Sequence, residues 1–381
     1  MRTRLVPVAA YLVSNLVTWL AAALAGRDYL NPLERAKWDS QHYLSIARTG
    51  YESFRCIDRY PTWPDFWCGN TAWFPGYPMS IRAVSWLGIP GELAGVLVSE
   101  VFFLGAMLLL WRLFDNKIST TSIGAMALAA VFPGSVYFHV VFGVSMCLYG
   151  LLLVLVGIRE QRWWVAGLGG FVALSTHIVG VIAVGAIAAS VLFGWRKFTW
   201  PGRLWRVAAA TAGAASALLV SLWTIYHDTG SWTIYFQHQN ESFHNLGWHD
   251  PLEQLVRFYK IQFRHSPEVA DHWLTAHSLT AHQPQLVLNV VLCLIILGCA
   301  GWLAYKRELQ PWQGAAVLMV IGAMVMPLTS GAWSAWYRHD ALMLVGVTVL
   351  RLPKPVWVLL VGISALQTLF LTGMWFGGTL I

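Results

Sequence analysis

The chain alternates long apolar stretches with short polar turns. A helix that crosses a bilayer needs roughly 20 apolar residues, and the stretches near that length are 5–25, 93–113, 119–137, 140–158, 205–226, 285–305, 311–329 and 355–376. The stretch 163–195 is too long for one span and predicts two short spans broken near Ser175–His177, while 339–351 predicts another short span. Backbone groups in lipid must be satisfied within the chain, so all these segments are expected to be helices.

This pattern predicts an all-α integral membrane protein, a helical bundle of about eleven spans that forms one domain over residues 1–381. Two segments between spans, 26–91 and 227–284, are too long for simple connections, and ordered loops of this length are usually functional. In the first, the spacing of apolar and basic residues over 32–47 predicts a helix lying in the membrane interface, and 79–87 predicts a second one. Most of the polar residues outside the spans are therefore expected on one face of the membrane.

The basic residues indicate the orientation, because cytosolic ends of spans carry an excess of lysine and arginine. With the N-terminus inside, the cytosolic side has only three acids, Asp115, Glu160 and Glu308. Its basic residues are Arg2, Arg4, Arg112, Lys117, Arg159, Arg162, Arg196, Lys197, Arg203, Arg206, Lys306, Arg307, Arg351 and Lys354. The two long segments then face outward. The net charge of +7 reflects this topology, and nucleic-acid binding is not expected. The first apolar run lacks a clear small-residue cleavage site, which favours an uncleaved span over a signal peptide.

Two of the five cysteines, Cys56 and Cys68, share the first outer segment. If that segment faces an oxidising compartment, a disulfide between them is expected, with two free thiols as the alternative. Cys147, Cys293 and Cys299 lie inside predicted spans, where a small buried side chain is the ordinary interpretation.

The second outer segment is rich in histidine and also carries acids, at His238, His244, His249, His265, His272, His277, His282, Asp250, Glu253, Glu268 and Asp271. Imidazole and carboxylate are common metal ligands, but no pair has the HExxH spacing. A pH-sensitive or acceptor-binding surface is a second interpretation. A solvated loop, which tolerates histidine freely, is the interpretation the sequence favours.

The first outer segment carries the clearest candidate for chemistry. Asp39 is the only acid in the run Lys37–Tyr43 and lies about 14 residues beyond the first span. A carboxylate in partly dry surroundings between Trp38 and Tyr43 can have a raised pKa and act as a general base. The alternative is a surface acid that pairs with Lys37 or Arg35.

A resemblance strengthens the first interpretation. Residues 38–51 read WDSQHYLSIARTGY, and WFPGYP follows at 73–78. They resemble the opening of the PIG-V family, GPI mannosyltransferase II and its prokaryotic relatives, whose pattern is roughly WDxxHFxxIAxxGY and then FFPxxP. Further on, FPGSVYF at 132–138 resembles the family's NPASVF-like stretch, and Arg338 resembles its R-Y/F segment. The similarity is strong over 32–80, weaker over 130–180 and only topological elsewhere.

The resemblance implies the GT-C architecture, a multi-span glycosyltransferase whose active site faces away from the cytosol. It implies a polyprenyl-phosphate mannose donor, and by motif match it makes Asp39 the catalytic base. The base would take a proton from a hydroxyl of a lipid-linked glycan or glycolipid in an inverting displacement, and the departing phosphate needs cationic or hydrogen-bonding support. The chain departs from the family's pattern at two places, which concern the binding of the acceptor and of the donor phosphate. Residues 142–146 read FGVSM where the family has an acidic Tyr-Ser-Glu segment, and His177 stands where an arginine is expected.

Arg338 and His339 are the first candidates to hold the donor phosphate, with His42 and His177 as further ones. An interface anchor is the alternative for Arg338, and a satisfied intramembrane histidine is the alternative for His177. The aromatic residues expected to line the substrate site are Trp38, Tyr43, Trp73, Phe74 and Tyr77. Candidate sugar-stacking platforms are Trp63, Trp67, Trp73, Trp232 and Trp248, although most of the 22 tryptophans must belong to the interfacial belt.

Glu100 is the one acid expected at membrane depth. Intramembrane acids are functional candidates by default, and a pairing with a helix-end cation is the alternative. No cofactor and no metal ligands are assigned. A divalent ion stays open, but Asp39-Ser40-Gln41 lacks the second acid of a DxD pair.

The sequence therefore predicts a membrane mannosyltransferase in a prokaryotic plasma membrane, or in the ER membrane of a eukaryote. Its partners would be the polyprenyl-phosphate donor, the lipid-linked glycan or glycolipid acceptor and membrane lipids. Transfer of another polyprenyl-phosphate sugar, such as arabinofuranose or glucose, is compatible with the same motifs. A transporter or flippase for lipid-linked glycans is the non-enzyme alternative. Transporters place polar residues near the bilayer midplane, often in paired repeats, whereas here they gather in the outer segments.

Overall fold

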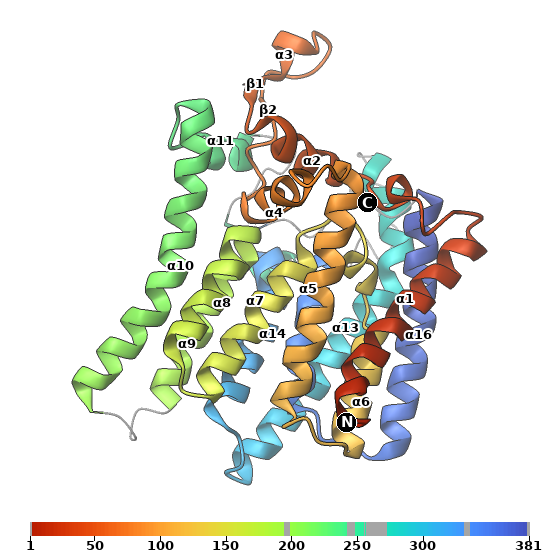
Figure 1. The fold of residues 1–381 in the computed structure, drawn as a ribbon, viewed down its shortest axis with the longest axis vertical. Helices are drawn as coiled ribbons and strands as arrows, with labels where there is room; N and C mark the ends of the chain where they lie inside the picture. Colours follow the sequence, from red (N-terminus) through yellow and green to blue (C-terminus); the bar gives the residue numbers. More distant parts are fainter. Residues whose placement is uncertain are drawn as a thin grey trace.

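The computed structural model describes residues 2–193, 199–241, 248–254, 256, 273–330 and 336–378. Its long helices run roughly parallel, and the short elements gather at the end opposite the N-terminus (Figure 1). Within the described residues six helices are long and apolar enough to cross a membrane: α1 (Val6–Leu24), α5 (Gly91–Leu113), α10 (Trp200–Thr229), α13 (Trp273–Tyr305, apolar from Val287), α14 (Pro311–Ser330) and α16 (Lys354–Gly377). The predicted all-helical membrane bundle is confirmed in this coarse sense, and the number of spans stays a prediction.

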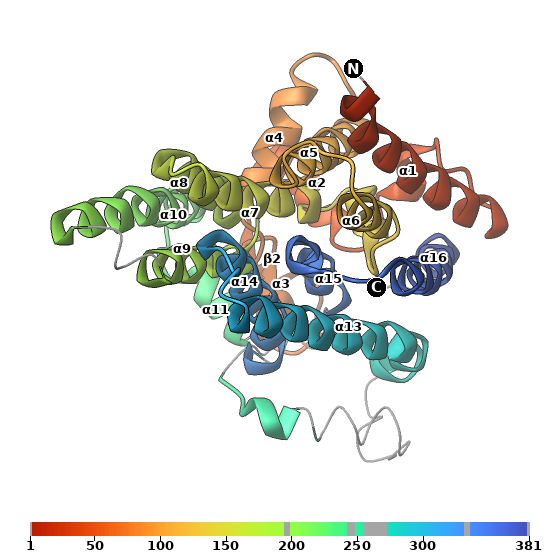
Figure 2. The same cartoon turned by 90° about the horizontal axis from the view of Figure 1, so that it is seen from below.

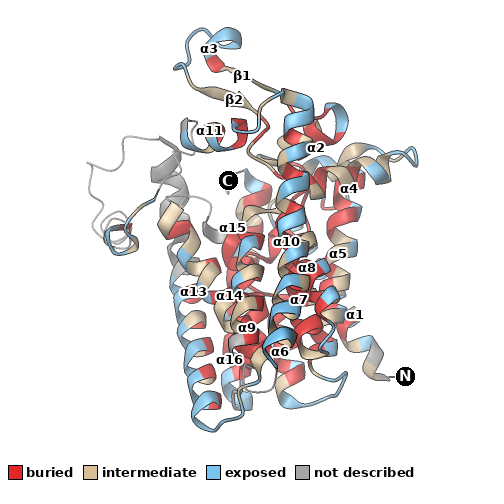
Figure 3. Ribbon diagram, turned by 90° about the vertical axis from the view of Figure 1, so that its left-hand side faces the viewer, coloured by how far each residue is buried: buried red, intermediate tan, exposed pale blue. Residues whose placement is uncertain are grey.

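Shorter apolar helices complete the bundle: α6 (Thr120–Ala130), α7 (Val144–Arg159), α8 (Trp163–Thr176), the 3-10 turn η4 (Ile178–Val181) and α9 (Ile182–Phe193). Seen along the bundle, α7 lies in the middle among α5, α8 and α14, with α1, α10, α13 and α16 at the perimeter (Figure 2). The outward faces of these perimeter helices are exposed and apolar, as at Leu219 on α10 and Leu366 on α16 (Figure 3). Such large exposed apolar faces indicate contact with lipid.

The break predicted near Ser175–His177 is present, because α8 ends at Thr176 and His177 caps η4. Two other expectations were wrong in detail. The stretch 119–137 is not one helix, since α6 ends at Ala130 before Pro133 and Gly134, whose φ is +80°. The stretch 339–351 is also not an ordinary α-helical span. The short helix α15 (Trp336–Asp340) is followed there by the 3-10 helix η8 (Ala341–Val349).

Between α6 and α7 the chain is buried yet irregular apart from the 3-10 turn η3 (Ser135–Phe138). Non-helical backbone at membrane depth needs partners from the protein itself. Side chains supply them, since Thr368 donates to the carbonyls of residues 131 and 132, Arg35 to that of 139, and Ser99 to those of 140 and 142. We call residues 131–143 the buried loop.

The first outer segment forms η2 (Pro32–Arg35), α2 (Ser40–Thr49), α3 (Cys56–Arg59) and α4 (Gly76–Ser85). The single interfacial helix predicted over 32–47 is interrupted at 36–39, where Trp38 has a φ of +56°. The second helix begins at Gly76, earlier than the predicted Met79, with Pro75 as N-cap and Pro78 in the first turn. Proline is tolerated there, because the N–H groups of a first turn have no partner within the helix.

A two-stranded antiparallel sheet, which the all-helical expectation did not include, closes a hairpin in the same segment. Strand β1 (Ser53–Arg55) pairs with β2 (Trp67–Gly69) in the register Ser53↔Gly69, Phe54↔Cys68 and Arg55↔Trp67. The structure joins Cys56 to Cys68 by a disulfide at the neck of this hairpin.

Serine at both Cys56 and Cys68 should loosen the hairpin and leave the bundle intact. Closing a loop of about 15 residues is worth about 3 kcal/mol of chain entropy, and the separation here is 12 residues. Limited proteolysis should cut the double variant within 57–67 faster than wild type, with little change in the melting temperature. Wild type treated with a reductant should match the variant. Equal cleavage rates of wild type and variant would contradict the expectation.

Candidate functional site

Asp39 and Arg338 form an ion pair that joins the first outer segment to α15. The Nη1 group of Arg338 donates to Oδ2 of Asp39 across 299 positions of sequence. Asp39 precedes α2, and its side chain makes no capping hydrogen bond to that helix. The side chains are 23% and 14% exposed, so the pair is shielded while Asp39 stays reachable. The sequence left open a pairing of Asp39 with Lys37 or Arg35, but in the structure Lys37 pairs with Glu34 and Arg35 pairs with Glu100.

The guanidinium of Arg338 packs against the buried loop. Its guanidinium carbon lies 5.1 Å from the ring centroid of Phe142, within the range of a cation–π contact. Phe142 packs edge-on against Tyr43 and Trp375, at 5.8 and 5.5 Å between centroids. The ion pair with Asp39 and the contact with this packed ring restrict the guanidinium, as a preorganised cation requires.

The pair lies at the wall of a cavity of about 320 Å³. The lining comes from segments far apart in sequence: Asp39, Tyr43, Ala72, Trp73, Phe74, Thr176, His177, Ile178, Val179, Tyr235, Phe236, Gln239, Met326, Ser330, Arg338 and His339. Most of these side chains are apolar or aromatic, with a few convergent polar groups. That combination is typical of small-molecule and cofactor sites.

Two histidines predicted as phosphate ligands meet in this cavity. The rings of His177 and His339 lie 5.2 Å apart between centroids, at 78°. The N–H of Val179 donates to Nδ1 of His177 at 3.2 Å, so a neutral His177 carries its proton on Nε2. A neutral imidazole with an Nε2–H group can donate to an anionic oxygen.

Tyr43 and Phe74 form part of the aromatic wall. Burial, together with the negative charge of Asp39, raises the pKa of the Tyr43 hydroxyl above its ordinary value. Tyr43 therefore stays protonated at neutral pH and keeps its capacity to donate. Phe74 packs on Tyr235 at 5.0 Å between centroids, which connects the motif at 73–78 to α11 (Ile234–Glu241).

The buried polar atoms of the lining that have no hydrogen-bond partner within the described residues include Oε1 of Gln239 and Nδ1 of His339. The amide nitrogen of Gln239 donates to the carbonyl of Ala72 at 3.2 Å, which holds the side chain in place. Buried polar groups are nearly always satisfied. A bound molecule with hydroxyl groups would supply the missing partners.

Other predicted residues lie beside the cavity or away from it. His42 stacks on Trp73 at 3.7 Å and 12°, and it supports that wall without being part of the described lining. Trp38 is 40% exposed and also lies outside that lining. Tyr77 is fully buried and binds α5, since its hydroxyl donates to the carbonyl of Gly95 and lies 2.7 Å from Ser99 Oγ. Its place in the structure is that of a core residue.

Sequence reasoning did not single out the contribution of α11, whose Tyr235, Phe236 and Gln239 line the cavity. The length of the segment 227–284 was the one indication. Among its histidines, His238 is buried and lies 2.7 Å from Thr71 Oγ1. His244, His265, His272, Glu268 and Asp271 lie outside the described residues, as do the side chains of His277 and His282. In the part of the chain that is described, no group of three or more potential ligands could hold a metal ion.

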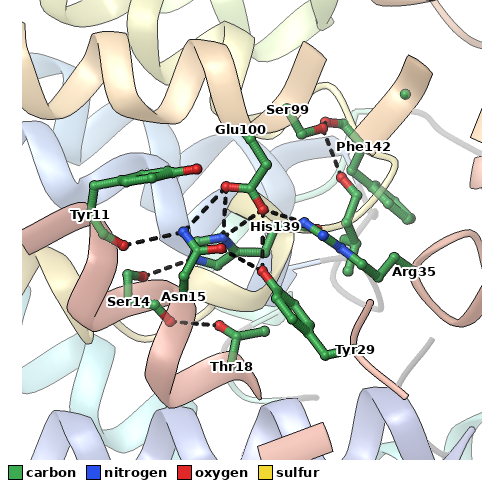
Figure 4. A network of polar contacts seen from close by, with 12 residues as sticks. Tyr11, Ser14, Asn15, Thr18, Tyr29, Arg35, Ser99, Glu100, His139 and Phe142 are labelled. Carbon is green, nitrogen blue, oxygen red and sulfur yellow. Dashed lines mark hydrogen bonds and ion pairs between the residues drawn. The ribbon is translucent and has the colours of Figure 1, made fainter. Parts of the chain in front are cut away.

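A second polar cluster lies deeper in the bundle around Glu100 of α5 (Figure 4). At 1.5 Å per residue, Glu100 lies about 14 Å from the N-terminal end of α5 at Gly91. Its carboxylate pairs with Arg35 and lies 3.2 Å from Nδ1 of His139. Tyr29 and Asn15 donate to it at 3.2 and 3.3 Å. The pairing with a cation that the sequence left open for Glu100 is thus present.

This cluster ties the first outer segment to the buried loop. Arg35 donates from Nε to the carbonyl of His139 at 2.6 Å, and the N–H of Val141 donates to the carbonyl of Arg35 at 3.0 Å. Nε2 of His139 lies 2.8 Å from Ser14 Oγ on α1. Because Phe142 follows directly, the cluster fixes the surface on which Arg338 rests. Sequence reasoning flagged Glu100 and missed its partners.

Alanine at Gly76 should disturb the cavity wall. An added Cβ would lie 2.7 Å from both the carbonyl oxygen and the hydroxyl of Ser175, closer than packed atoms allow. The start of α4 must then move away from the end of α8, and with it Trp73 relative to His177. Overpacking of this kind costs about 1–3 kcal/mol, which a melting curve in detergent should detect. Alanine at Gly91, where the nearest atom is 3.6 Å away, is the control and should be tolerated.

Comparison with known protein families and with characterised proteins found no match to this chain. The resemblance of its motifs to the PIG-V family therefore stays a prediction.

Proposed function

We propose that the protein is a membrane glycosyltransferase of the GT-C type that transfers mannose from a polyprenyl-phosphate donor. The acceptor would be a hydroxyl of a lipid-linked glycan or glycolipid outside the cytosol of a prokaryotic cell. The observation that carries the proposal is the Asp39–Arg338 pair at the wall of a largely apolar cavity. An acid and a cation that lie together beside space for a substrate support a general base next to a phosphate-binding group.

In this proposal Arg338 has two tasks. A guanidinium presents five N–H donors in a rigid fork, so it can hold a carboxylate and a phosphate oxygen together. Such a bridge would place the donor phosphate near Asp39 and stabilise the charge that grows as the sugar–phosphate bond breaks. His177 and His339 would add hydrogen bonds to the same phosphate.

Asp39 would act as the general base. It would accept the proton of the acceptor hydroxyl while that oxygen attacks the anomeric carbon from the face opposite the phosphate. The C–O bond to the acceptor forms as the bond to the phosphate breaks, and the anomeric configuration is inverted. Because the leaving group is a lipid phosphate, the reaction needs no nucleotide-binding fold. The described part of the chain, a helical bundle, agrees with this.

The position of the pair supports an enzyme over a transporter. The residues that line the cavity include members of α2 and α11. These helices lie with α4 at one end of the bundle (Figure 1). Transport sites lie near the bilayer midplane. In the polar cluster that lies deeper, the Glu100 carboxylate is already bound by the ion pair with Arg35 and by the hydrogen bond from Tyr29, so it is not free to bind a transported molecule.

The test is transfer by the full-length protein in vesicles given polyprenyl-phosphate mannose, arabinofuranose or glucose in separate reactions. We expect transfer from the mannose donor in wild type and none in Asp39→Ala. Transfer from one of the other donors would identify the alternative sugar. Undiminished transfer by the variant would overturn the role of Asp39. Movement of a lipid-linked glycan across the vesicle without transfer would overturn the enzyme.

A further inference from the structure

The hairpin 53–69, with its two-stranded sheet and its disulfide, differs from the helices that make up most of the described chain. It projects beyond α2 and α11 along the length of the bundle, away from the end that holds the N-terminus (Figure 1). All of it is described, and Cys56 is its only buried residue. It adds almost nothing to the apolar core, so its structure needs another explanation.

The hairpin is nevertheless rigidly braced. Besides the disulfide, Arg55 donates from Nε to the Asp65 carboxylate and from Nη2 to the Asp65 carbonyl, both at 2.7 Å. The guanidinium of Arg59 lies 3.6 Å from the ring centroid of Phe54 and pairs with Glu52 at 3.0 Å. Exposed ion pairs are each worth little, but together with the disulfide they hold one conformation outside the bundle.

The foot of the hairpin is joined to the cavity wall. Asn70 accepts from the N–H of Glu52 at 2.9 Å and donates to the carbonyl of Gly50 at 3.1 Å. Strand β2 then runs directly into Ala72 and Trp73, which line the cavity. The hairpin is thus a stiff outward continuation of one cavity wall.

The tip carries two exposed aromatic rings side by side. Tyr60 and Trp63 are 44% and 41% exposed, and their ring centroids lie 4.8 Å apart at 31°. A backbone hydrogen bond of 2.9 Å from Trp63 to Tyr60 holds the turn between them. Asp58 is exposed close by in sequence. Amphipathic rings bordered by hydrogen-bonding groups suit a ligand that has apolar faces and many hydroxyls, which describes a sugar.

The size of the cavity says where the rest of an acceptor must lie. At about 320 Å³ it is near the lower limit of ligand sites, which hold roughly 300–1,000 Å³. It has room for a reacting sugar with its phosphate but not for an oligosaccharide as well. The direction in which the hairpin projects also takes its tip away from the lipid-facing part of the bundle (Figure 3). A water-exposed glycan suits this position better than a lipid does.

We infer that Tyr60 and Trp63 form a docking platform for the outer sugar units of an oligosaccharide acceptor, an inference that rests on the proposed function. The platform recognises neutral hexose rings by stacking, and nearby polar side chains bind their hydroxyls. The platform strengthens the binding of acceptors that have several sugar units and does not affect the binding of single sugars.

The test measures the binding of linear mannotetraose to the full-length protein in detergent by saturation-transfer NMR. Trp63→Ala and Tyr60→Ala should lower the affinity about three- to tenfold, as expected for one lost aromatic contact. Methyl α-mannoside should show no such difference. Trp86→Ala, at an 80% exposed tryptophan after α4, is the matched control and should bind as wild type does. A non-reducing peptide map verifies the Cys56–Cys68 bond in every variant.

Equal mannotetraose signals from wild type and both hairpin variants, strong or absent, would overturn the platform. A loss in Trp86→Ala as large as in the hairpin variants would also overturn it, since any exposed tryptophan would then do the same. Asp39→Asn should retain full binding. Because this measurement needs no sugar transfer, failure of the platform and failure of the proposed reaction are seen separately.

Discussion

Asparagine at position 39 should lower the rate constant of sugar transfer by about 10²- to 10⁴-fold, the usual contribution of a general base. Asparagine keeps the shape of the side chain and can still accept a hydrogen bond from Arg338, but it cannot take a proton. The KM for the lipid-phosphate donor should stay the same or fall, because Arg338 no longer shares its charge with a carboxylate. Steady-state kinetics in vesicles measure both quantities.

Two controls separate this effect from simple damage to the ion pair. Glutamine at Arg338 should raise the donor KM and also lower kcat, since it removes the cation that would hold the donor phosphate in the proposed reaction. Asp28→Asn changes an exposed acid of the same outer segment and keeps its hydrogen bond to the N–H of Leu30, so it should behave as wild type. A kcat for Asp39→Asn within threefold of wild type would contradict a general base at this position.

Leucine at Glu100 should be the most destabilising substitution considered. It leaves Arg35 buried without its carboxylate, and breaking a buried pair from one side costs about 3–5 kcal/mol. It also removes the acceptor that orders His139, Tyr29 and Asn15. Unfolding by heat or denaturant in detergent measures the loss, and the buried loop should become accessible to hydrogen exchange first.

The double variant Glu100→Leu with Arg35→Met tests the cause. Replacing both charges by apolar side chains is often neutral, so the double variant should be more stable than Glu100→Leu alone. The carbonyl of His139 still loses a donor, which costs about 1–3 kcal/mol. Glu92→Gln, in the exposed pair with Arg48, is the control and should change stability by about 1 kcal/mol or less. A double variant as unstable as the single one would show that the charges are not the cause.

Prediction from the sequence worked where the physics is local. The length of each apolar stretch is a property of the stretch itself, and α1, α5, α14 and α16 begin and end within a few residues of their predicted limits. The break at His177 was visible in the same way. Prediction failed over 119–137, because apolar length cannot tell a helix from a buried irregular loop whose carbonyls are satisfied from elsewhere.

In the candidate site, too, prediction succeeded for local features and failed for those that depend on the packing of the helices. Asp39 and the aromatic run at 73–78 drew attention through spacing and resemblance, and Trp73 and Phe74 do line the cavity. Tyr77 belongs to the same run but turns into the core, because α4 starts at Gly76 and sends successive side chains to different faces. A motif places residues along the chain and leaves open which way a helix turns each of them.

By itself the sequence determined that this chain forms apolar helices, that its polar segments gather at one end, and that Asp39 stands in an aromatic setting there. Only the tertiary structure decided that Asp39 pairs with Arg338, that Glu100 pairs with Arg35, and that α11 lines the cavity. The reason is physical. Helix formation and transfer into lipid depend on neighbours a few residues away, whereas an ion pair depends on packing that brings together side chains as much as 299 residues apart.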